Sequence, residues 1–328
     1  MPFKIDPEVG AAIAALSPPG SEPPPPTPVG DVATRRAGVE TMFPALMPPM
    51  PKDVTTKDYH VAASDGHQIL LRFYTKNGAT AKSTAGVLYM HGGGFIAGSV
   101  PLYDPVVGNY VSKTGVPFLN VEYRLAPENV YPVPVEDCYA GLVWLHEHAS
   151  ELGIDPAKIA IMGDSGGGGM AAALTHLAKE RKGSSIAKQI LIYPMLDDRN
   201  VAQDDHLAAF AVWSSTDNET GWGAMLGSRR GTSTVPPTAA PARMTDATGL
   251  PPMYIETGEL DLFRAENLVY AAQFGKAGVS VEVHVHPGCP HGYDLFAPNS
   301  KVTKRAFEDR FRAILSIEPL EGASSPKL

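Results

Sequence analysis

One short glycine-rich segment places a serine at the centre of a predicted sharp turn. The segment Gly163-Asp-Ser-Gly-Gly167 follows the apolar run Ile159–Met162 and precedes a run with helical spacing. In a strand–turn–helix of the form G-x-S-x-G, small neighbours permit a turn that exposes the serine hydroxyl. The N-terminus of the following helix directs N–H groups toward developing negative charge. We therefore predict Ser165 as a nucleophile, with Asp164 beside it as a supporting residue.

A phosphate-binding loop or a plain tight turn is the alternative interpretation of this segment. Walker-type phosphate loops need a lysine after the glycines, and none stands at that position here. The chain also has a formal net charge of −8, whereas a nucleic-acid binder needs a basic face. We therefore expect no nucleic-acid partner.

A second glycine run offers backbone donors. The segment His91-Gly-Gly-Gly-Phe95 ends a predicted strand, and consecutive glycines expose N–H groups with no side chain in the way. An oxyanion hole requires such preorganised donors. We expect the N–H groups of Gly92, Gly93 and Gly166 to hold an oxyanion, and His91 to support the loop rather than act as a base. A flexible turn is the simpler alternative.

A nucleophilic serine needs a base, which should lie on a loop after a late strand. The chain has ten histidines. Among them, His291 follows the predicted strand Ser280–His286 and is flanked by proline and glycine. His284 and His286 alternate within that strand and are expected to be structural or surface residues. We therefore predict His291 as the base.

The base in turn needs an acid that orients it, and the acid should follow the preceding strand. Asp261 lies shortly after the predicted strand Met253–Glu256, with Glu259 as the reserve candidate. The order along the chain is then Ser165, Asp261, His291. This is the order expected of an α/β-hydrolase.

Taken together, these motifs resemble those of the hormone-sensitive-lipase family of carboxylesterases, a branch of the α/β-hydrolases. The resemblance extends from about residue 5 to the C-terminal helix. The matching segments are His91–Phe95, Tyr123-Arg-Leu-Ala-Pro-Glu128, Pro132-Val-Pro-Val-Glu-Asp137 and Gly163–Gly167. The resemblance implies ester hydrolysis without a metal or organic cofactor. It also implies a cap built from the N-terminal segment and an insertion near residues 200–250.

The chain departs from the family pattern at two places. Gly166 stands where the family usually has alanine after the serine, but its N–H is retained. The acid segment of the family usually reads Asp-Pro-Leu-x-Asp, whereas here it reads Asp261-Leu-Phe-Arg-Ala265. Because the first aspartate is kept and the last is absent, this departure supports Asp261.

The elements that must position these residues alternate along the chain. Two segments around Asp65-Gly66, namely Tyr59–Ala63 and Ile69–Tyr74, predict an antiparallel pair. Later strands are predicted at Ala85–Met90, Pro117–Tyr123, Ile159–Met162, Gln189–Tyr193, Met253–Glu256 and Ser280–His286. Helices are predicted at Tyr103–Lys113, Val135–Ala149, Met170–Glu180, Arg264–Ala277 and Val302–Ile317. The alternation predicts an α/β fold with a mostly parallel central sheet flanked by helices.

Two segments fall outside this alternation. The first 30 residues hold nine prolines, including Pro23–Pro26, and predict either a flexible tail or two helices separated by a proline-broken crossing. Helical spacing favours helices near Pro7–Leu16 and Asp31–Met47. The stretch Asp197–Leu250 is too long for an ordinary connection and predicts a lid or binding element. We predict a cap segment at 1–54, core at 55–198, a cap insertion at 199–250 and core at 251–328.

The cellular setting follows from what the chain lacks. Its two cysteines are too few for a disulfide framework, so two buried thiols are expected, with a single bridge as the alternative. The sequence has no run of about 18 apolar residues, so we expect no membrane-spanning helix. The apolar stretch Gly10–Leu16 follows acidic rather than basic residues, so no signal peptide is expected. We predict a cytoplasmic protein; a homodimer is a possible assembly.

Several other residues have a structural interpretation beside a functional one. Arg124 and Glu128 are expected in structural ion pairs, and Glu136 and Asp137 as helix or loop anchors. A further set could line a cap or simply pack in the core: Met42, Phe43, Met47, Met50, Trp213 and Trp222.

The predicted activity is hydrolysis of short- to medium-chain carboxylic esters through an acyl-enzyme, with a small ester as the only required partner. A lactonase, an amidase or a natural-product deacetylase with the same triad is the alternative. A small-molecule receptor on the same scaffold is the alternative outside catalysis, and the presence of His291 with Ser165 and Asp261 argues against it.

Overall fold

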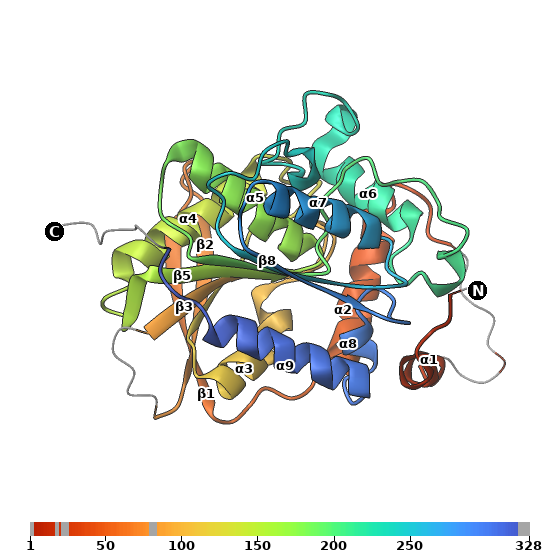
Figure 1. The fold of residues 1–328 in the computed structure, drawn as a ribbon, viewed down its shortest axis with the longest axis horizontal. Helices are drawn as coiled ribbons and strands as arrows, with labels where there is room; N and C mark the ends of the chain where they lie inside the picture. Colours follow the sequence, from red (N-terminus) through yellow and green to blue (C-terminus); the bar gives the residue numbers. More distant parts are fainter. Residues whose placement is uncertain (1–2, 17–19, 21–25, 79–83, 321–328) are drawn as a thin grey trace.

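The computed structural model describes residues 3–16, 20, 26–78 and 84–320. Over these residues the chain forms an eight-stranded sheet with helices on both faces (Figure 1). The strands lie in the order β1-β2-β4-β3-β5-β6-β7-β8. Their bounds are β1 Val54–Ala62, β2 Gln68–Lys76, β3 Thr84–Met90, β4 Phe118–Val121, β5 Ile154–Asp164, β6 Lys188–Ile192, β7 Met253–Gly258 and β8 Val281–His286.

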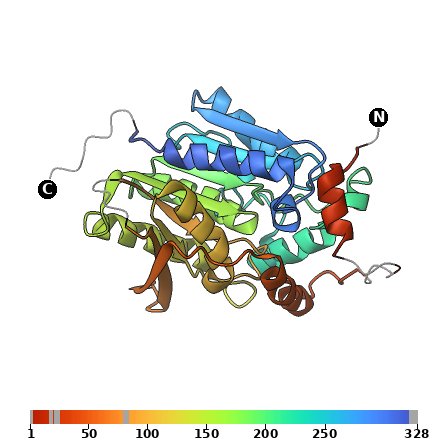
Figure 2. The same ribbon diagram turned by 90° about the horizontal axis from the view of Figure 1, so that it is seen from below.

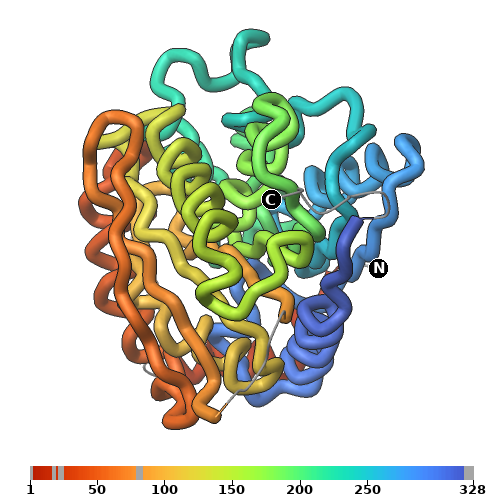
Figure 3. Tube along the Cα trace, turned by 90° about the vertical axis from the view of Figure 1, so that its left-hand side faces the viewer, coloured from red at the N-terminus to blue at the C-terminus, as the bar shows by residue number. Residues whose placement is uncertain are grey.

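The predicted antiparallel pair is confirmed. Strands β1 and β2 pair antiparallel, β2 pairs antiparallel with β4, and every later neighbour is parallel. At the turn, Gly66 has φ +84°, and the Asp65 carboxylate accepts a hydrogen bond from His67 N at 3.1 Å. Figure 3 shows the orange hairpin along one edge of the molecule. The mostly parallel sheet is therefore as the sequence predicts.

The central strands are buried on both faces, so each contributes side chains to two hydrophobic cores. On β3, Leu88 and Met90 belong to the core on one face of the sheet, under helices α4 (Val133–His148), α5 (Gly166–Arg181) and α7 (Arg264–Lys276). Val87 and Tyr89 belong to the core on the other face, under α3 (Val100–Thr114) and α9 (Lys301–Leu315). Side chains alternate along a strand, which is why β3 reads as a continuous apolar run. The helices are α1 Pro7–Ala14, α2 Val32–Leu46, α3 Val100–Thr114, α4 Val133–His148, α5 Gly166–Arg181, α6 Ser215–Leu226, α7 Arg264–Lys276, α8 Tyr293–Phe296 and α9 Lys301–Leu315.

The two cysteines lie on opposite faces of this sheet. Cys138 packs in the core under α4, and Cys289 packs in the core under α9. Both are buried, free thiols. The interpretation as two buried thiols is confirmed, and the single bridge is not formed.

The N-terminal segment is helical, as its spacing predicts. Helix α1 begins after Asp6, whose carboxylate accepts a hydrogen bond from Glu8 N at 2.9 Å. Helix α2 begins after Asp31, whose carboxylate accepts from Thr34 N at 3.0 Å. These aspartates satisfy N–H groups that lack a partner in the first turn of a helix. Of the proline run Pro23–Pro26, the first three residues lie outside the described residues.

The insertion lies beside this N-terminal segment. Helix α6 contacts the α2 region through Thr220 Oγ1, which accepts a hydrogen bond from Gly30 N at 3.0 Å. The buried Arg35 guanidinium pairs with Asp217 at 2.7 Å. Figure 2 shows α2 next to the teal α6. Two segments far apart in the sequence thus pack together at the edge where the parallel strands end.

Candidate active site

Ser165 stands on a strained turn between β5 and α5. Its φ is +54°, a left-handed conformation that non-glycine residues rarely adopt. The neighbouring glycines permit this turn, because a Cβ on Gly163 would lie 2.3 Å from Gly167 O, and one on Gly167 would lie 2.1 Å from Met90 O. Helix α5 begins at Gly166, four residues before the predicted start at Met170. The glycines that look like loop in the sequence form the first helical turn.

The structure brings the three predicted side chains together. His291 Nε2 lies 2.8 Å from Ser165 Oγ, and His291 Nδ1 lies 2.8 Å from Asp261 Oδ2. Asp261 follows β7 and His291 follows β8, so both reach the carboxyl edge of the sheet. The other oxygen of Asp261 accepts a hydrogen bond from Phe263 N at 2.9 Å. Asp261 is 1% exposed and His291 9%, so this line is largely shielded from water.

The rival side chains lie elsewhere. The reserve acid Glu259 accepts a hydrogen bond from Gly288 N at 2.9 Å and so holds the loop before His291. His284 lies 2.6 Å from Glu282, and His286 lies 3.8 Å from Glu256. These three residues are structural, as expected for the two histidines.

The glycine run after β3 lies against the serine turn. Gly93 has φ +124° and Gly94 has φ +58°, and a Cβ on Gly166 would lie 2.8 Å from Gly94 N. Gly93 and Gly94 line the same cavity as Ser165, whereas Gly92 does not. Gly94 is therefore a candidate donor that the sequence reasoning missed. Three consecutive glycines gave no local signal of which two would face the serine.

A cavity of about 470 Å³ opens over Ser165. Its polar floor includes Ser165, His291 and Tyr193. Its apolar wall comes largely from the N-terminal segment, the insertion and the chain after His291. These apolar residues are Val39, Met42, Phe43, Val212, Trp213, Leu295 and Phe296. The cavity therefore exists only because three separate segments close around the strand ends.

The sequence left six residues open between lining a cap and packing in the core, and the structure gives them different positions. Met42, Phe43 and Trp213 line the cavity. Trp222 is fully buried and packs against Phe95, with ring centroids 4.9 Å apart. The last two lie elsewhere: Met47 lines a neighbouring hollow, and Met50 packs beside α3.

Comparison with known proteins places the chain in a family. Residues 87–295 match the family described as having the alpha/beta hydrolase fold. The chain belongs to this α/β-hydrolase family. It is 37% identical over 223 residues to carboxylesterase NlhH of Mycobacterium tuberculosis, covering 64% of this chain and 67% of that one. It is 30% identical over 240 residues to ethyl acetate hydrolase of Pseudomonas putida, covering 72% and 74%.

A solved structure extends the likeness over nearly the whole chain. Bacterial heroin esterase superposes with a TM-score of 0.85 at 35% identity, over 95% of this chain and 97% of that one. The chain is therefore a carboxylic ester hydrolase of the hormone-sensitive-lipase-like branch, as its motifs predict. In the described part of this hydrolase, we find no helix with the length and apolar character needed to cross a membrane.

His91 occupies a closed site in the hydrolase. Its Nδ1 lies 2.9 Å from Gly92 O, and its ring stacks on Tyr123 with centroids 4.3 Å apart. The Tyr123 hydroxyl donates to His91 O at 2.6 Å. Burial lowers the pKa of His91 to about 4, so the ring is neutral at pH 7 with its proton on Nδ1. These contacts fix the backbone at the start of the glycine run.

Asp164 is buried beside the nucleophile and lines the cavity. Burial raises the pKa of its carboxyl group to about 7. Within the described residues, its Oδ1 has no hydrogen-bond partner. A group of this kind is half neutral near pH 7, which reduces the negative charge next to a reacting serine.

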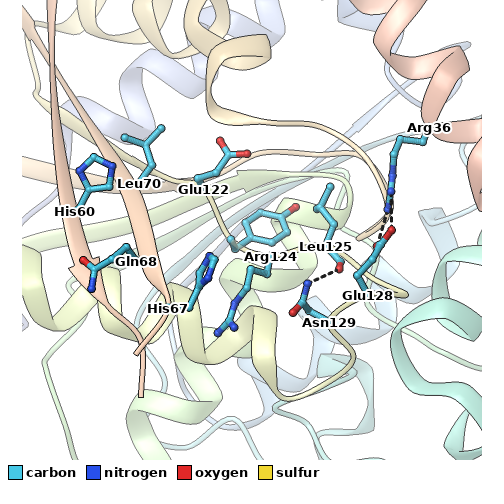
Figure 4. A pocket seen from close by; sticks show the side chains of 11 residues that line it. Arg36, His60, His67, Gln68, Leu70, Glu122, Arg124, Leu125, Glu128 and Asn129 are labelled. Carbon is cyan, nitrogen blue, oxygen red and sulfur yellow. Dashed lines mark hydrogen bonds and ion pairs between the residues drawn. The ribbon is translucent and has the colours of Figure 1, made fainter. Parts of the chain in front are cut away.

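Figure 4 shows another hollow, of about 400 Å³, and Ser165 is not among the residues that line it. Its charged groups already have partners: Arg36 pairs with Glu128 at 2.8 Å, and Arg124 pairs with Asp65 at 2.6 Å and with Asp137 at 2.7 Å. The expected structural ion pairs of Arg124 and Glu128 are therefore confirmed. Among the described residues that line this hollow, none is a nucleophile with an adjacent base.

One cluster has the residue types of a metal site. Ligand atoms of Glu282, His284 and Asp309 lie within 4.8 Å of one another. However, Arg312 forms ion pairs with both Glu282 and Asp309. A guanidinium already balances these carboxylates, so the residues do not form a site prepared for a cation.

Two aromatic residues around His291 were also missed by the sequence reasoning. The Tyr193 and Phe263 rings make edge contacts with the imidazole at centroid distances of 4.8 Å and 5.0 Å. Each follows a strand that ends at the site, Tyr193 directly after β6 and Phe263 shortly after β7. That position was the available signal, because residues just beyond parallel strands gather at one edge of the sheet.

Proposed function

We propose that the chain hydrolyses short- to medium-chain carboxylic esters with Ser165 as nucleophile, His291 as base and Asp261 as orienting acid. The observation that carries this proposal is the hydrogen-bonded line from Ser165 Oγ through His291 to Asp261, with both distances 2.8 Å. A hydroxyl becomes a nucleophile when an oriented imidazole accepts its proton.

The reaction proceeds in two halves. Ser165 Oγ attacks the ester carbonyl carbon while His291 Nε2 takes the hydroxyl proton. The tetrahedral intermediate collapses, His291 gives that proton to the departing alkoxide, and an acyl-serine remains. A water molecule then attacks the acyl carbon as His291 takes one of its protons. Collapse returns this proton to Ser165 Oγ and releases the carboxylic acid.

The oxyanion is held by backbone donors in this mechanism. We assign this role to the N–H groups of Gly93, Gly94 and Gly166, because Gly93 and Gly94 line the cavity with Ser165 and Gly166 begins α5. Gly92 was the sequence prediction for this position and stays a prediction. The N-terminus of α5 adds the favourable end of its dipole.

The segments 1–54 and 199–250 act as a cap over the core formed by 55–198 and 251–328. Supporting this division, the cavity wall takes Met42 and Phe43 from the first segment and Trp213 from the second. The Arg35–Asp217 ion pair joins the two segments. An apolar cap excludes water and strengthens electrostatic interactions at the reacting carbonyl.

The test combines a variant with an active-site label. Ser165→Ala is expected to lower hydrolysis of p-nitrophenyl butyrate by about 10⁴-fold or more, while Ser185→Ala keeps the activity of the unaltered enzyme. A fluorophosphonate probe is expected to modify Ser165, located by peptide mass spectrometry. Substantial activity in Ser165→Ala would refute the assignment.

The substrate panel should begin with the molecules that the relatives' names supply. Similarity to bacterial heroin esterase and ethyl acetate hydrolase makes heroin and ethyl acetate direct tests of the alcohol side. Lactones and anilides test the alternative of a lactonase or amidase with the same triad. A receptor would leave the fluorophosphonate probe unreacted.

We also propose a cytoplasmic enzyme that acts on small molecules and not on nucleic acid, with a homodimer as the assembly to test. The two buried free thiols and the net charge of −8 support the first two statements. Cell fractionation tests the location, and light scattering tests the assembly.

A further inference from the structure

A cluster of buried charges lies directly below the candidate site. Arg310 of α9 is 1% exposed and Glu256 of β7 is fully buried. Arg310 Nη2 lies 2.5 Å from Glu256 Oε1, and Arg310 Nη1 lies 2.6 Å from Asp294 Oδ2. Breaking one partner from such a group leaves an uncompensated buried charge. The cluster therefore ties α8 and α9 to β7, through Asp294, Arg310 and Glu256.

The cluster reaches the imidazole through one phenol. The Tyr193 hydroxyl donates a hydrogen bond to Asp294 Oδ1 at 2.9 Å, and both groups are buried. The ring of Tyr193 meets the His291 ring at an interplanar angle of 68°. Phe263 meets the same imidazole at 89°. The imidazole is thus held between two aromatic rings, of which only Tyr193 is fastened by its own polar group.

The backbone supports the same arrangement. Tyr193 has φ +35°, an unfavourable conformation for a residue other than glycine. Its N–H donates to Glu256 O at 2.7 Å, so β7 holds both ends of this residue: the backbone directly and the side chain through Arg310 and Asp294. Asp294 also lies only three residues after His291, in the short helix α8 that begins at Tyr293.

We infer that Tyr193 and Asp294 are positioning residues of the ester hydrolysis, which hold the His291 ring at the angle that directs Nε2 to Ser165. The inference rests on the proposed function, because it assumes that His291 is the base. Proton transfer depends on this angle in both halves of the reaction. A positioning role therefore predicts a loss in kcat with KM largely unchanged.

The decisive variant is Tyr193→Phe, which keeps the ring and removes the hydroxyl that bonds Asp294. Its matched control is Tyr254→Phe. The Tyr254 hydroxyl donates to Glu256 Oε2 at 2.6 Å, so the control also removes a buried phenol–carboxylate hydrogen bond from the same cluster. The ring of Tyr254 meets His284 and does not line the cavity over Ser165.

For Tyr193→Phe, we expect kcat for p-nitrophenyl butyrate to fall roughly tenfold, since small misplacements of catalytic groups cost one to two orders of magnitude. KM should stay within about twofold. We expect the melting temperature to fall by a similar amount in both variants, because each loses one buried hydrogen bond. For Tyr254→Phe, however, kcat should stay within about twofold of the unaltered enzyme. Equal kcat values in the two variants would overturn the inference. A rise in KM alone would also overturn it, by making Tyr193 a substrate contact.

A second variant tests the hydrogen bond between Tyr193 and Asp294 from the carboxylate side. Asp294→Asn weakens the link between Arg310 and Tyr193, and its kcat is expected to fall as in Tyr193→Phe. If both act through one hydrogen bond, the double variant loses no more than the larger single loss. Additive losses contradict this. Fluorophosphonate labelling of each variant separates the two levels: failure to label Ser165 in the unaltered enzyme refutes the proposed function, whereas equal labelling rates in Tyr193→Phe and Tyr254→Phe refute only the positioning role.

Discussion

The loop after β3 and the loop after β8 each present a buried histidine, yet the two histidines have opposite surroundings. His91 lies between a backbone carbonyl and the Tyr123 ring, and burial holds its pKa near 4. His291 lies between a hydroxyl and a carboxylate, each at 2.8 Å. His91 can therefore serve as a fixed donor, whereas His291 can exchange a proton. The partners, and not the residue type, decide the chemistry.

The largest expected effect separates the two histidines directly. His291→Ala is expected to lower kcat/KM for p-nitrophenyl butyrate by about 10⁴-fold or more, because the serine loses its base. His91→Ala keeps that base and is expected to lower activity by only about tenfold, through looser oxyanion donors. Similar losses of activity in both variants would contradict the different roles assigned to His91 and His291.

The acid beside His291 gives the next test. Asp261→Asn is expected to lower kcat by about 10⁴-fold, because the amide favours the wrong imidazole tautomer. Glu259→Gln is the matched control: it is the neighbouring acid, and its carboxylate bonds the backbone at Gly288. We expect this control to keep kcat within about threefold. Steady-state kinetics on both variants would show whether the reserve acid participates.

A smaller effect is expected in the glycine run after His91. A Cβ on Gly94 would lie 2.3 Å from the Trp213 ring, so Gly94→Ala should displace the donor loop and lower kcat by about 10²-fold. Gly278→Ala is the control, since Gly278 also has positive φ, +70°, but open space around it. Gly278→Ala adds backbone strain without a steric clash, so we expect kcat to stay unchanged. If Gly94→Ala stays fully active, Gly94 is not a donor.

The smallest effect concerns stability and pH. The pKa of His91 is lowered to about 4 when folded, against about 6.5 when unfolded. Between these values the unfolded chain binds the extra proton, so His91 makes the protein less stable as pH falls from 7 to 5. The expected contribution is about 2 kcal/mol, from 1.4 kcal/mol per pKa unit.

Comparison with a variant isolates this contribution, because Asp164 acts in the opposite direction. Its pKa is raised to about 7, so the folded chain binds the extra proton there. Urea unfolding at pH 7 and pH 5 should show a smaller acid-induced loss in His91→Gln than in the unaltered chain. An equal loss of stability in His91→Gln and in the unaltered chain would mean that a group other than His91 takes up the proton.

Much of the fold follows from local patterns. The turn at Asp65-Gly66 and the alternation of strands and helices predict the sheet, because hydrophobic periodicity and turn chemistry act over short stretches. The N-terminal helices also follow from spacing, with Asp31 placed to cap α2. The late start predicted for α5 was wrong, because glycines are poor helix formers and only their close contacts with β3 make them the right residues there.

The amino-acid sequence was enough to predict Ser165, Asp261 and His291 as the candidate triad, because each follows a strand whose carboxyl end must lie at one edge of a parallel sheet. Tertiary structure alone decided that Gly94 rather than Gly92 lines the cavity, that Arg35 meets Asp217, and that the Arg310 cluster lies beneath His291. These contacts join segments far apart in the chain. No local pattern encodes them, since they depend on how the helices pack once the sheet has formed.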